Sequence, residues 1–313
     1  MHEIFTLTLN NVLKILVFIA MGYALRRSKG FPKESGKTLS MLAALIFSPA
    51  YTIRSLARDF TVETLSEKLL ILGSGILFLA VSVALGYLAV RLLGKTALRK
   101  NVLLYALAFT NYGYFGYPLI ESVFGSRILV DYIVFSQPLN FATATFGYWL
   151  LTQRKDFDLK SFLLAPVVWS PFVGAAIGLS GIRLPGVVED TLAALGGCMS
   201  PTVMILMGFV LGAVSLREMF GHLGAYGLSL VRLLAIPLVG GCIYYLCGAR
   251  GIWFLLPVLT LAMPIGSNVV VYPESCGVDT RDNAKTVFLS YILAMVLLPL
   301  SFSLISHLAG NMS

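Results

Sequence analysis

The segment Ala108-Phe-Thr-Asn-Tyr-Gly-Tyr-Phe-Gly-Tyr-Pro-Leu-Ile120 decides the fold of this chain. It lies in an uncharged window, 101–120, with the length and hydropathy of a membrane helix. Its centre nevertheless holds residues that interrupt helices, namely Asn111, Gly113, Gly116 and Pro118. Unpaired amides are costly in hydrocarbon, so such a break is tolerated only where protein or a water-filled cavity surrounds it. We therefore expect two half-helices that meet at an unwound centre, the usual substrate site of a transporter.

A second uncharged window, 251–273, carries a similar interruption. It contains Pro264-Ile-Gly-Ser-Asn268 and, like the first window, reaches a Tyr-Pro pair and then a glutamate, Glu274. One break on its own indicates little, because membrane helices are rich in Gly and Pro. Two breaks at matching places favour broken helices in two corresponding halves of the chain.

The composition is that of an all-α polytopic membrane protein. Hydrophobic residues make up 58% of the chain and charged residues 12%, against about 25% charged in soluble proteins. Lys14, the first cation, already lies inside the first apolar run, so we expect that run to be a span and not a cleaved signal. The cations behind the net charge of +8 lie in short loops, where the positive-inside rule for membrane proteins explains them. We therefore expect no nucleic-acid partner.

Ten membrane spans account for the apolar runs, and the fourth and ninth are the broken ones. We predict them at 4–25, 37–56, 68–92, 100–124, 127–152, 161–181, 190–213, 221–247, 251–275 and 284–308.

The distribution of Lys and Arg predicts the orientation. With the N-terminus outside, the loops and margins inside the cell hold fifteen cations. Those outside hold six: Arg54, Arg58, Lys68, Arg127, Arg183 and Arg250. The positive-inside rule therefore places both termini on the non-cytoplasmic side of the membrane.

A short inside loop at 153–160 divides the spans into two sets of five, in residues 1–152 and 153–313. Because five is odd, the second set runs through the membrane in the opposite sense. Leu42-Ala-Ala-Leu45 before Ser48-Pro49 recurs as Leu192-Ala-Ala-Leu195 before Ser200-Pro201. Together with the paired breaks, this favours an inverted 5+5 repeat.

The breaks also supply the candidate substrate-binding residues. Free amides at a half-helix N-terminus attract an anion without a formal charge. Candidate donors are Asn111, Tyr114, Ser267 and Asn268, and the glycines that allow close backbone approach are Gly113, Gly116 and Gly266. The alternative is that both asparagines only cap freed backbone groups. Gln137, Asn140 and Thr143 in span five share a helical face, which either supports the pocket or forms interhelical hydrogen bonds.

Charged residues in or beside the spans are further candidates. Glu121, Asp131 and Glu274 are possible proton or cation carriers, although we expect each at the interface, in water. For Lys14 and Arg232, which lie deep in spans, we expect packing against carbonyls.

No enzyme signature is present. His2, His222 and His307 are scattered, no phosphate-binding loop motif occurs, and no metal site or cofactor is indicated. Cys198, Cys242, Cys247 and Cys276 lack any paired ligand spacing, and we expect them to be small core residues.

These motifs together resemble the auxin efflux carrier family, which includes plant PIN-type carriers and bacterial malate and malonate permeases. The resemblance rests on Phe47-Ser-Pro49, on the two breaks (Asn111–Pro118 and Met263–Asn268) and on Gln137. It implies a fold like the bile-acid/sodium symporters, with broken helices four and nine crossing. Scaffold helices would occupy 4–56 and 161–213, and a mobile transport domain 68–152 and 221–308.

By the same resemblance, Asn111, Pro118, Pro264 and Asn268 flank the substrate, Gln137 supports them, and two copies form a homodimer through the scaffold. The short 153–160 loop fits a bacterial, inner-membrane member. We expect a secondary transporter for a small organic anion, a carboxylate, working by an elevator-type mechanism with H⁺, Na⁺ or no coupling ion. The alternatives are a cation/proton antiporter, which would need carboxylates inside the breaks, and a membrane sensor of a metabolite.

Overall fold

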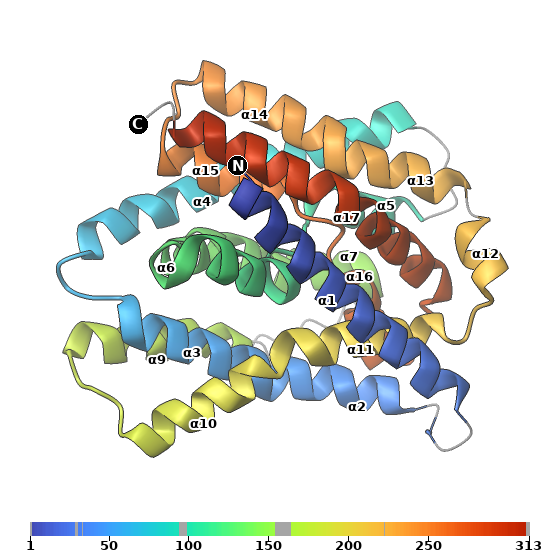
Figure 1. Cartoon of the computed structure of the whole chain (residues 1–313), viewed down its shortest axis with the longest axis horizontal. Helices are drawn as coiled ribbons and strands as arrows, with labels where there is room; N and C mark the ends of the chain where they lie inside the picture. Colours follow the sequence, from blue (N-terminus) through green and yellow to red (C-terminus); the bar gives the residue numbers. More distant parts are fainter. Residues whose placement is uncertain are drawn as a thin grey trace.

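The structure, a computed structural model, describes residues 2–28, 31–32, 34–93, 99–153, 164–221 and 223–310. Within these ranges the chain is helical, and its one isolated β-bridge joins Thr110 to Ile265. Figure 1 shows the helices in order: α1 (His2–Arg27), α2 (Ser35–Leu42), η1 (Ala43–Phe47), α3 (Ser48–Asp59), α4 (Leu65–Leu93), α5 (Lys100–Ala108), η2 (Tyr112–Gly116), α6 (Tyr117–Ala142), η3 (Thr143–Gly147), α7 (Tyr148–Thr152), α9 (Pro166–Ser180), α10 (Gly186–Gly197), α11 (Met199–Leu211), α12 (Leu216–Phe220), α13 (Leu223–Leu230), η4 (Val231–Ala235), α14 (Ile236–Leu246), α15 (Ile252–Ala262), α16 (Asn268–Ser275) and α17 (Arg281–Gly310).

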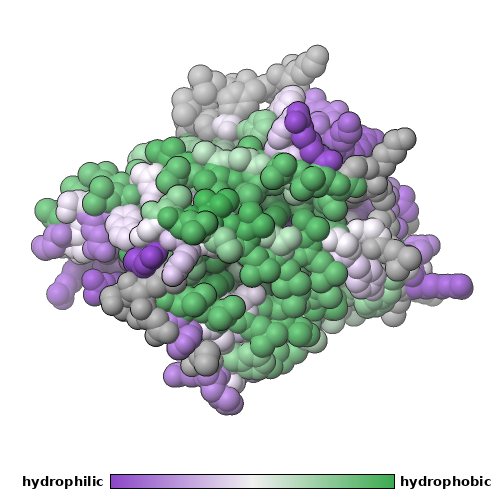
Figure 2. Space-filling view, turned by 90° about the horizontal axis from the view of Figure 1, so that it is seen from above, coloured by the Kyte–Doolittle hydropathy of each residue, from purple (hydrophilic) through white to green (hydrophobic). Residues whose placement is uncertain are grey.

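Several of these helices have the length and hydropathy needed to cross a membrane, which confirms an all-α, multi-pass architecture. Six uninterrupted segments qualify: His2–Arg27, Ser35–Asp59, Leu65–Leu93, Gly186–Leu211, Gly224–Leu246 and Arg281–Ala309. Two shorter apolar helices, Pro166–Ser180 and Ile252–Ala262, lie beside them. Figure 2 shows a broad apolar surface across the middle of one face, with hydrophilic residues gathered toward its edges.

The helices pack in two groups that meet at the centre of the molecule. In the lower part of Figure 1, α3 packs against α9 and α10, and α11 packs against α1 and α2. In the upper part, α4 packs against α5 and against α6 at the centre, while α15 packs against both α14 and α17. Helix α1 also contacts α17 and so bridges the two groups.

The contact between α1 and α11 depends on two glycines that face each other. A Cβ on Gly22 would lie 1.9 Å from the carbonyl oxygen of Ile205, and one on Gly208 would lie 1.8 Å from that of Ile19. Neither helix can therefore carry a side chain there without moving apart. In a membrane, small residues of this kind let helix backbones approach closely enough for van der Waals packing to hold them.

We expect Gly208→Ala to lower the free energy of unfolding by about 1–3 kcal/mol, since the added methyl group meets backbone atoms that cannot rotate away. The control is Gly73→Ala on α4, where a Cβ meets nothing within 4 Å. Thermal unfolding of both variants in detergent measures the difference. Equal melting temperatures would contradict the close-approach account.

Irregular helical turns precede three prolines. The π-helical segments η1, η2 and η4 lead directly into Pro49, Pro118 and Pro237, each of which lies in the first turn of the next helix. A proline ring clashes with the preceding turn and lacks an amide donor, and a widened turn accommodates both effects. The chain also turns at Gly125, where φ is +82°, between the predicted fourth and fifth spans.

Some sequence expectations need correction. Cys198, Cys242 and Cys247 are exposed rather than in the core, because apolar thiols are tolerated on a surface that faces lipid. Lys68 was predicted to lie at the margin of an outside loop, but the residue is buried, with 3% of its surface exposed. The predicted connection at 153–160 lies outside the described residues except for Gln153, as does the start of the sixth span at 161–163.

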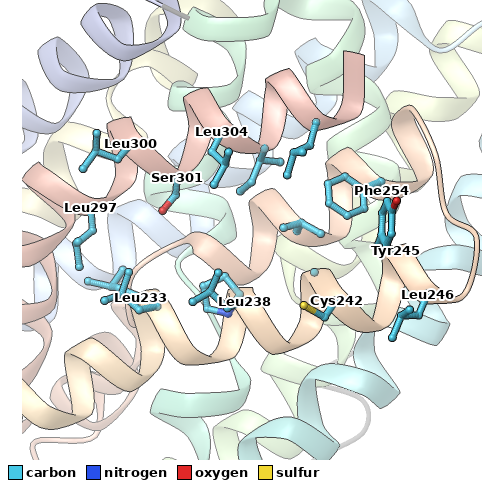
Figure 3. Close-up of a pocket in the computed structure, with 16 residues that line it drawn as sticks. Leu233, Leu238, Cys242, Tyr245, Leu246, Phe254, Leu297, Leu300, Ser301 and Leu304 are labelled. Carbon is cyan, nitrogen blue, oxygen red and sulfur yellow. The ribbon is translucent and has the colours of Figure 1, made fainter. Parts of the chain in front are cut away.

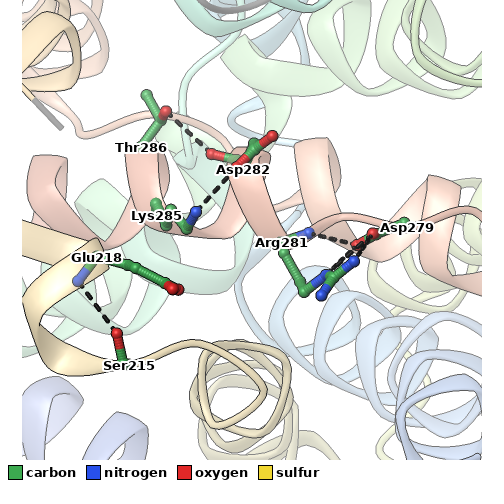
Figure 4. A network of polar contacts seen from close by, with 7 residues as sticks. All are labelled: Ser215, Glu218, Asp279, Arg281, Asp282, Lys285 and Thr286. Carbon is green, nitrogen blue, oxygen red and sulfur yellow. Dashed lines mark hydrogen bonds and ion pairs between the residues drawn. The ribbon is translucent and has the colours of Figure 1, made fainter.

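One end of the molecule carries a polar network around the start of α17, at a side predicted to be cytoplasmic (Figure 4). Lys285 Nζ contacts Asp282 Oδ1 at 3.0 Å, and Arg281 Nη2 contacts Asp279 Oδ2 at 2.5 Å. The Arg281 guanidinium hydrogen-bonds to the Asp279 carboxylate and lowers its pKa. The Arg281–Asp279 pair is exposed on both sides. Exposed pairs contribute little to stability, so this pair marks a solvated edge.

Candidate functional site

The two predicted breaks are confirmed, and they lie against each other. Helix α5 ends at Ala108 and α15 ends at Ala262, and each is followed by non-helical backbone. The Asn111 amide donates to the Pro264 carbonyl oxygen at 2.9 Å, and the Gly266 amide donates to that of Phe109 at 3.4 Å. The freed backbone of each break is thus partly paired by the other, as burial in an apolar interior requires.

The side-chain amide of Asn111 makes hydrogen bonds through both its oxygen and its nitrogen. Its Oδ1 accepts from the Phe115 amide at 3.3 Å and so caps the first turn after the break. Its Nδ2 donates to the hydroxyl of Tyr291 on α17 at 2.5 Å. Asn111 therefore caps a freed backbone amide, and its contact with a substrate stays a prediction.

A small cavity of about 40 Å³ lies at the crossing. Three polar atoms of its lining residues, Thr110 Oγ1, Ser267 Oγ and Asn268 Oδ1, have no hydrogen-bond partner among the described residues. A buried polar group without a partner is costly, so three at one cavity indicate a place for water or a ligand group. A space of this volume holds a few waters, or one carboxylate.

Both second half-helices begin at this cavity. Tyr112, Gly113 and Tyr114, from the first turn after one break, line it, and so do Ser267 and Asn268, at the start of α16. Helix N-termini carry partial positive charge and present amide donors. Among the described residues, no Asp, Glu, Lys or Arg lines the cavity, so these dipoles and hydroxyls dominate its electrostatics.

Most of the predicted binding residues come together here. Those lining the cavity are Asn111, Gly113, Tyr114, Asn140, Gly266, Ser267 and Asn268. Pro264 lies at the crossing through its carbonyl oxygen. Pro118 instead lines a neighbouring cavity. Gln137 donates to Ile133 within its own helix at 2.8 Å, and its buried Oε1 has no partner among the described residues.

Sequence reasoning missed the opposite wall. Ser48 and Thr52 on α3, Val167 on α9 and Met199 on α11 close the cavity from the other helix group. Two signals in the sequence point to this wall. Ser48 belongs to the Phe47-Ser-Pro49 motif, and Ser48 and Thr52 are four residues apart, which places two hydroxyls on one helical face. The cavity therefore lies between the two groups of helices and not inside one of them.

Arg232 links the two first half-helices at the crossing. It is 0% exposed, and its Nη1 donates to the Leu107 carbonyl oxygen at 2.7 Å while its Nε donates to that of Met263 at 3.4 Å. These carbonyls belong to the C-terminal ends of the two first half-helices, where the dipole is negative. The expected packing against carbonyls is confirmed for Arg232. It is wrong for Lys14, which is exposed.

The three candidate carboxylates all lie away from the cavity. Glu121 Oε2 accepts from the Tyr51 hydroxyl at 2.7 Å, and Glu274 Oε2 accepts from Thr280 at 2.9 Å. Asp131 is 2% exposed and pairs with Lys68 across α4 and α6. The expectation of an interfacial position in water is therefore wrong for Asp131, because a buried cation on the neighbouring helix neutralises it.

The sequence profile of a family described as "Membrane transport protein" matches residues 7–161 and 154–302. The chain therefore belongs to this family, the auxin efflux carrier-like family of membrane transporters that its motifs indicated. It is accordingly an integral, multi-pass membrane protein of a family of transporters.

Two relatives align over nearly their whole length. An uncharacterized transporter of Methanothermobacter thermautotrophicus is 28% identical over 95% of this chain and 98% of its own. The uncharacterized transporter YfdV of Escherichia coli K12 is 20% identical over 94% of this chain and 96% of its own. The likeness thus covers both breaks and the helices that surround them.

Proposed function

We propose that the protein is a secondary transporter that carries a small organic anion, a carboxylate, by alternating access. The observation that carries this proposal is the cavity at the crossing. Two helix N-termini and the side chains of Thr110, Ser267 and Asn268 meet there without a permanent cation. Hydroxyls can donate, and the Asn268 amide offers either oxygen or nitrogen after a half-turn. This set binds a carboxylate without the cost of an unpaired buried cation.

The proposed architecture is ten spans in an inverted 5+5 repeat, with the crossing formed by spans four and nine. In this scheme 4–56 and 161–213 form a static scaffold, and 68–152 and 221–308 form a transport domain. The position of the cavity supports an elevator-type movement, since one wall comes from α3, α9 and α11 and the other from the breaks. A site at the boundary between two bodies opens to either side when one body slides past the other.

A larger cavity supplies a route of access. It has a volume of about 250 Å³ and is lined by Lys14, Glu121 and Tyr51, among others. The Tyr51 ring stacks on Tyr117, which lines the crossing cavity, with ring centroids 5.9 Å apart. We place this tyrosine pair between the two cavities as a gate. The Lys14 ammonium and the Glu121 carboxylate both line this cavity, so the proposed approach carries no net charge.

Arg232 also bears on which ion is coupled to substrate transport. In transporters with broken helices, the C-terminal carbonyls of the half-helices are where a coupling cation binds. Here the guanidinium already contacts one carbonyl from each half-helix. We therefore propose that no sodium ion is needed at that position. Coupling to protons through Glu121, Asp131 or Glu274 stays a prediction, as do the inner-membrane location, the outward termini and a scaffold-mediated homodimer.

The experiment is a thermal-shift screen of the purified protein against mono- and dicarboxylates, because a ligand of the native state raises its apparent stability. The best ligand is then tested for uptake into proteoliposomes, with and without sodium. We expect saturable uptake that sodium does not change. Binding without flux would identify a sensor, and sodium-dependent uptake would contradict the role given to Arg232.

A further inference from the structure

An apolar groove of about 600 Å³ lies between α14, α15 and α17 and shares no lining residue with the cavity at the crossing (Figure 3). Its floor is buried, with Phe254 and Val258 each 3% exposed and Ile305 6% exposed. Its rim is open, with Leu238 61% and Leu304 52% exposed. A hydrocarbon-lined groove that opens toward the bilayer is filled by hydrocarbon.

Small residues create the hollow. Gly241 and Cys242 on α14 and Ser301 on α17 line the groove, where larger side chains would fill it. A Cβ on Gly241 would only touch Val258, at 3.5 Å. The space is therefore a feature of the sequence and not the result of poor packing between long side chains.

The groove is somewhat longer than one leaflet is thick. From Leu233 to Leu246 it follows α14, a helical rise of about 20 Å. Half of the hydrocarbon core of a bilayer is about 15 Å thick. The groove begins next to Arg232 at the crossing and ends at the turn between α14 and α15. It therefore suits one acyl chain that enters from the surface of a single leaflet.

A cation lies at the open end. Arg250, in the turn after α14, is exposed, and its guanidinium lies 4.6 Å from the ring centroid of Tyr245, which lines the groove. Its Nη1 donates to the carbonyl oxygens of Tyr245 and Ala249, which fixes the group at the mouth. No carboxylate of the described residues pairs with it. Arginine beside tyrosine at a membrane interface is suited to a lipid phosphate.

We propose that this groove binds one anionic phospholipid, with an acyl chain along α14 and α17 and the phosphate at Arg250. The competing occupant is a second copy of the chain. Charge disfavours it, since two copies that each carry a net charge of +8 repel each other. An anionic phospholipid meets both requirements, since its phosphodiester supplies negative charge to Arg250 and its acyl chain supplies hydrocarbon along the groove.

Native mass spectrometry of the detergent-purified protein tests this with phosphatidylglycerol and phosphatidylcholine as probes. We expect one tightly retained phosphatidylglycerol, weaker retention of phosphatidylcholine, and about fivefold or greater loss of phosphatidylglycerol in Arg250→Ala. The control is Arg183→Ala, in another turn away from the groove. Ser301→Trp fills the groove and should also remove the lipid, while Leu77→Trp on the exposed surface of α4 should not.

Cys242 provides a test in the unaltered chain, so that it does not depend on the folding of a variant. Phosphatidylglycerol should slow the labelling of Cys242 by an apolar maleimide and leave Cys198 unchanged, with each site quantified by peptide mass spectrometry. Equal protection by both lipids, equal retention by Arg250→Ala, or a dimer that Ser301→Trp dissociates would each overturn the proposal.

Discussion

Replacing Asp131 with alanine is expected to lower the free energy of unfolding by about 3–5 kcal/mol, the largest stability effect that we predict. Asp131 on α6 and Lys68 on α4 form an ion pair whose side chains are 3% and 4% exposed. Without the carboxylate, the Lys68 ammonium stays buried with no counter-charge. Thermal or denaturant unfolding in a mild detergent measures the loss.

The control is the double substitution Lys68→Met and Asp131→Leu, which removes both charges and fills the space with apolar groups. Such replacements of buried ion pairs are often neutral or stabilising. The double variant should therefore be clearly more stable than Asp131→Ala alone. If both lose stability equally, the pair does not act as a unit and the buried-pair account is wrong.

Replacing Asn268 with alanine is expected to weaken carboxylate binding by about tenfold to a hundredfold, the loss of one hydrogen bond to a charged group. Its Oδ1 has no hydrogen-bond partner among the described residues, and the side chain's contact within the fold is with the hydroxyl of the buried Tyr105. The melting temperature of the free protein should change little. Titration of the purified protein with its best carboxylate ligand measures the affinity.

Asn111→Ala should behave differently, because Asn111 caps η2 and contacts Tyr291. We expect this variant to lose both stability and affinity, with the cap worth about 1 kcal/mol. Asn101→Ala, on the first turn of α5 and away from the cavity, is the matched control. An Asn268→Ala variant with unchanged affinity would remove that residue from the site.

The central feature of the fold was predictable from the sequence for a local reason. Asn, Gly and Pro at the centre of an uncharged window cannot continue a helix in hydrocarbon, and this holds whatever surrounds them. The same argument identified Asn111, Ser267 and Asn268, because residues at a break lie beside freed backbone. The structure bears out both breaks and brings them into contact through Thr110 and Ile265.

What the sequence could not predict depends on contacts between distant segments. Ser48 and Thr52 reach the cavity only because α3 packs across it, and the Lys68–Asp131 pair forms only because α4 and α6 are neighbours. Hydropathy also fails to separate a buried position from one that faces lipid, since both favour apolar residues. The exposed Cys242 is a case in point.

The most direct test of the central claim, that the crossing binds a negatively charged carboxylate, compares a ligand with its uncharged amide. The purified protein is titrated with the best carboxylate from the screen and with the matching amide, and the same pair is used on Asn268→Ala. We predict that the wild-type protein binds the carboxylate much more tightly than the amide, and that Asn268→Ala loses most of this preference. Equal affinities of the wild-type protein for the two ligands, or a preference that Asn268→Ala keeps in full, would contradict the account.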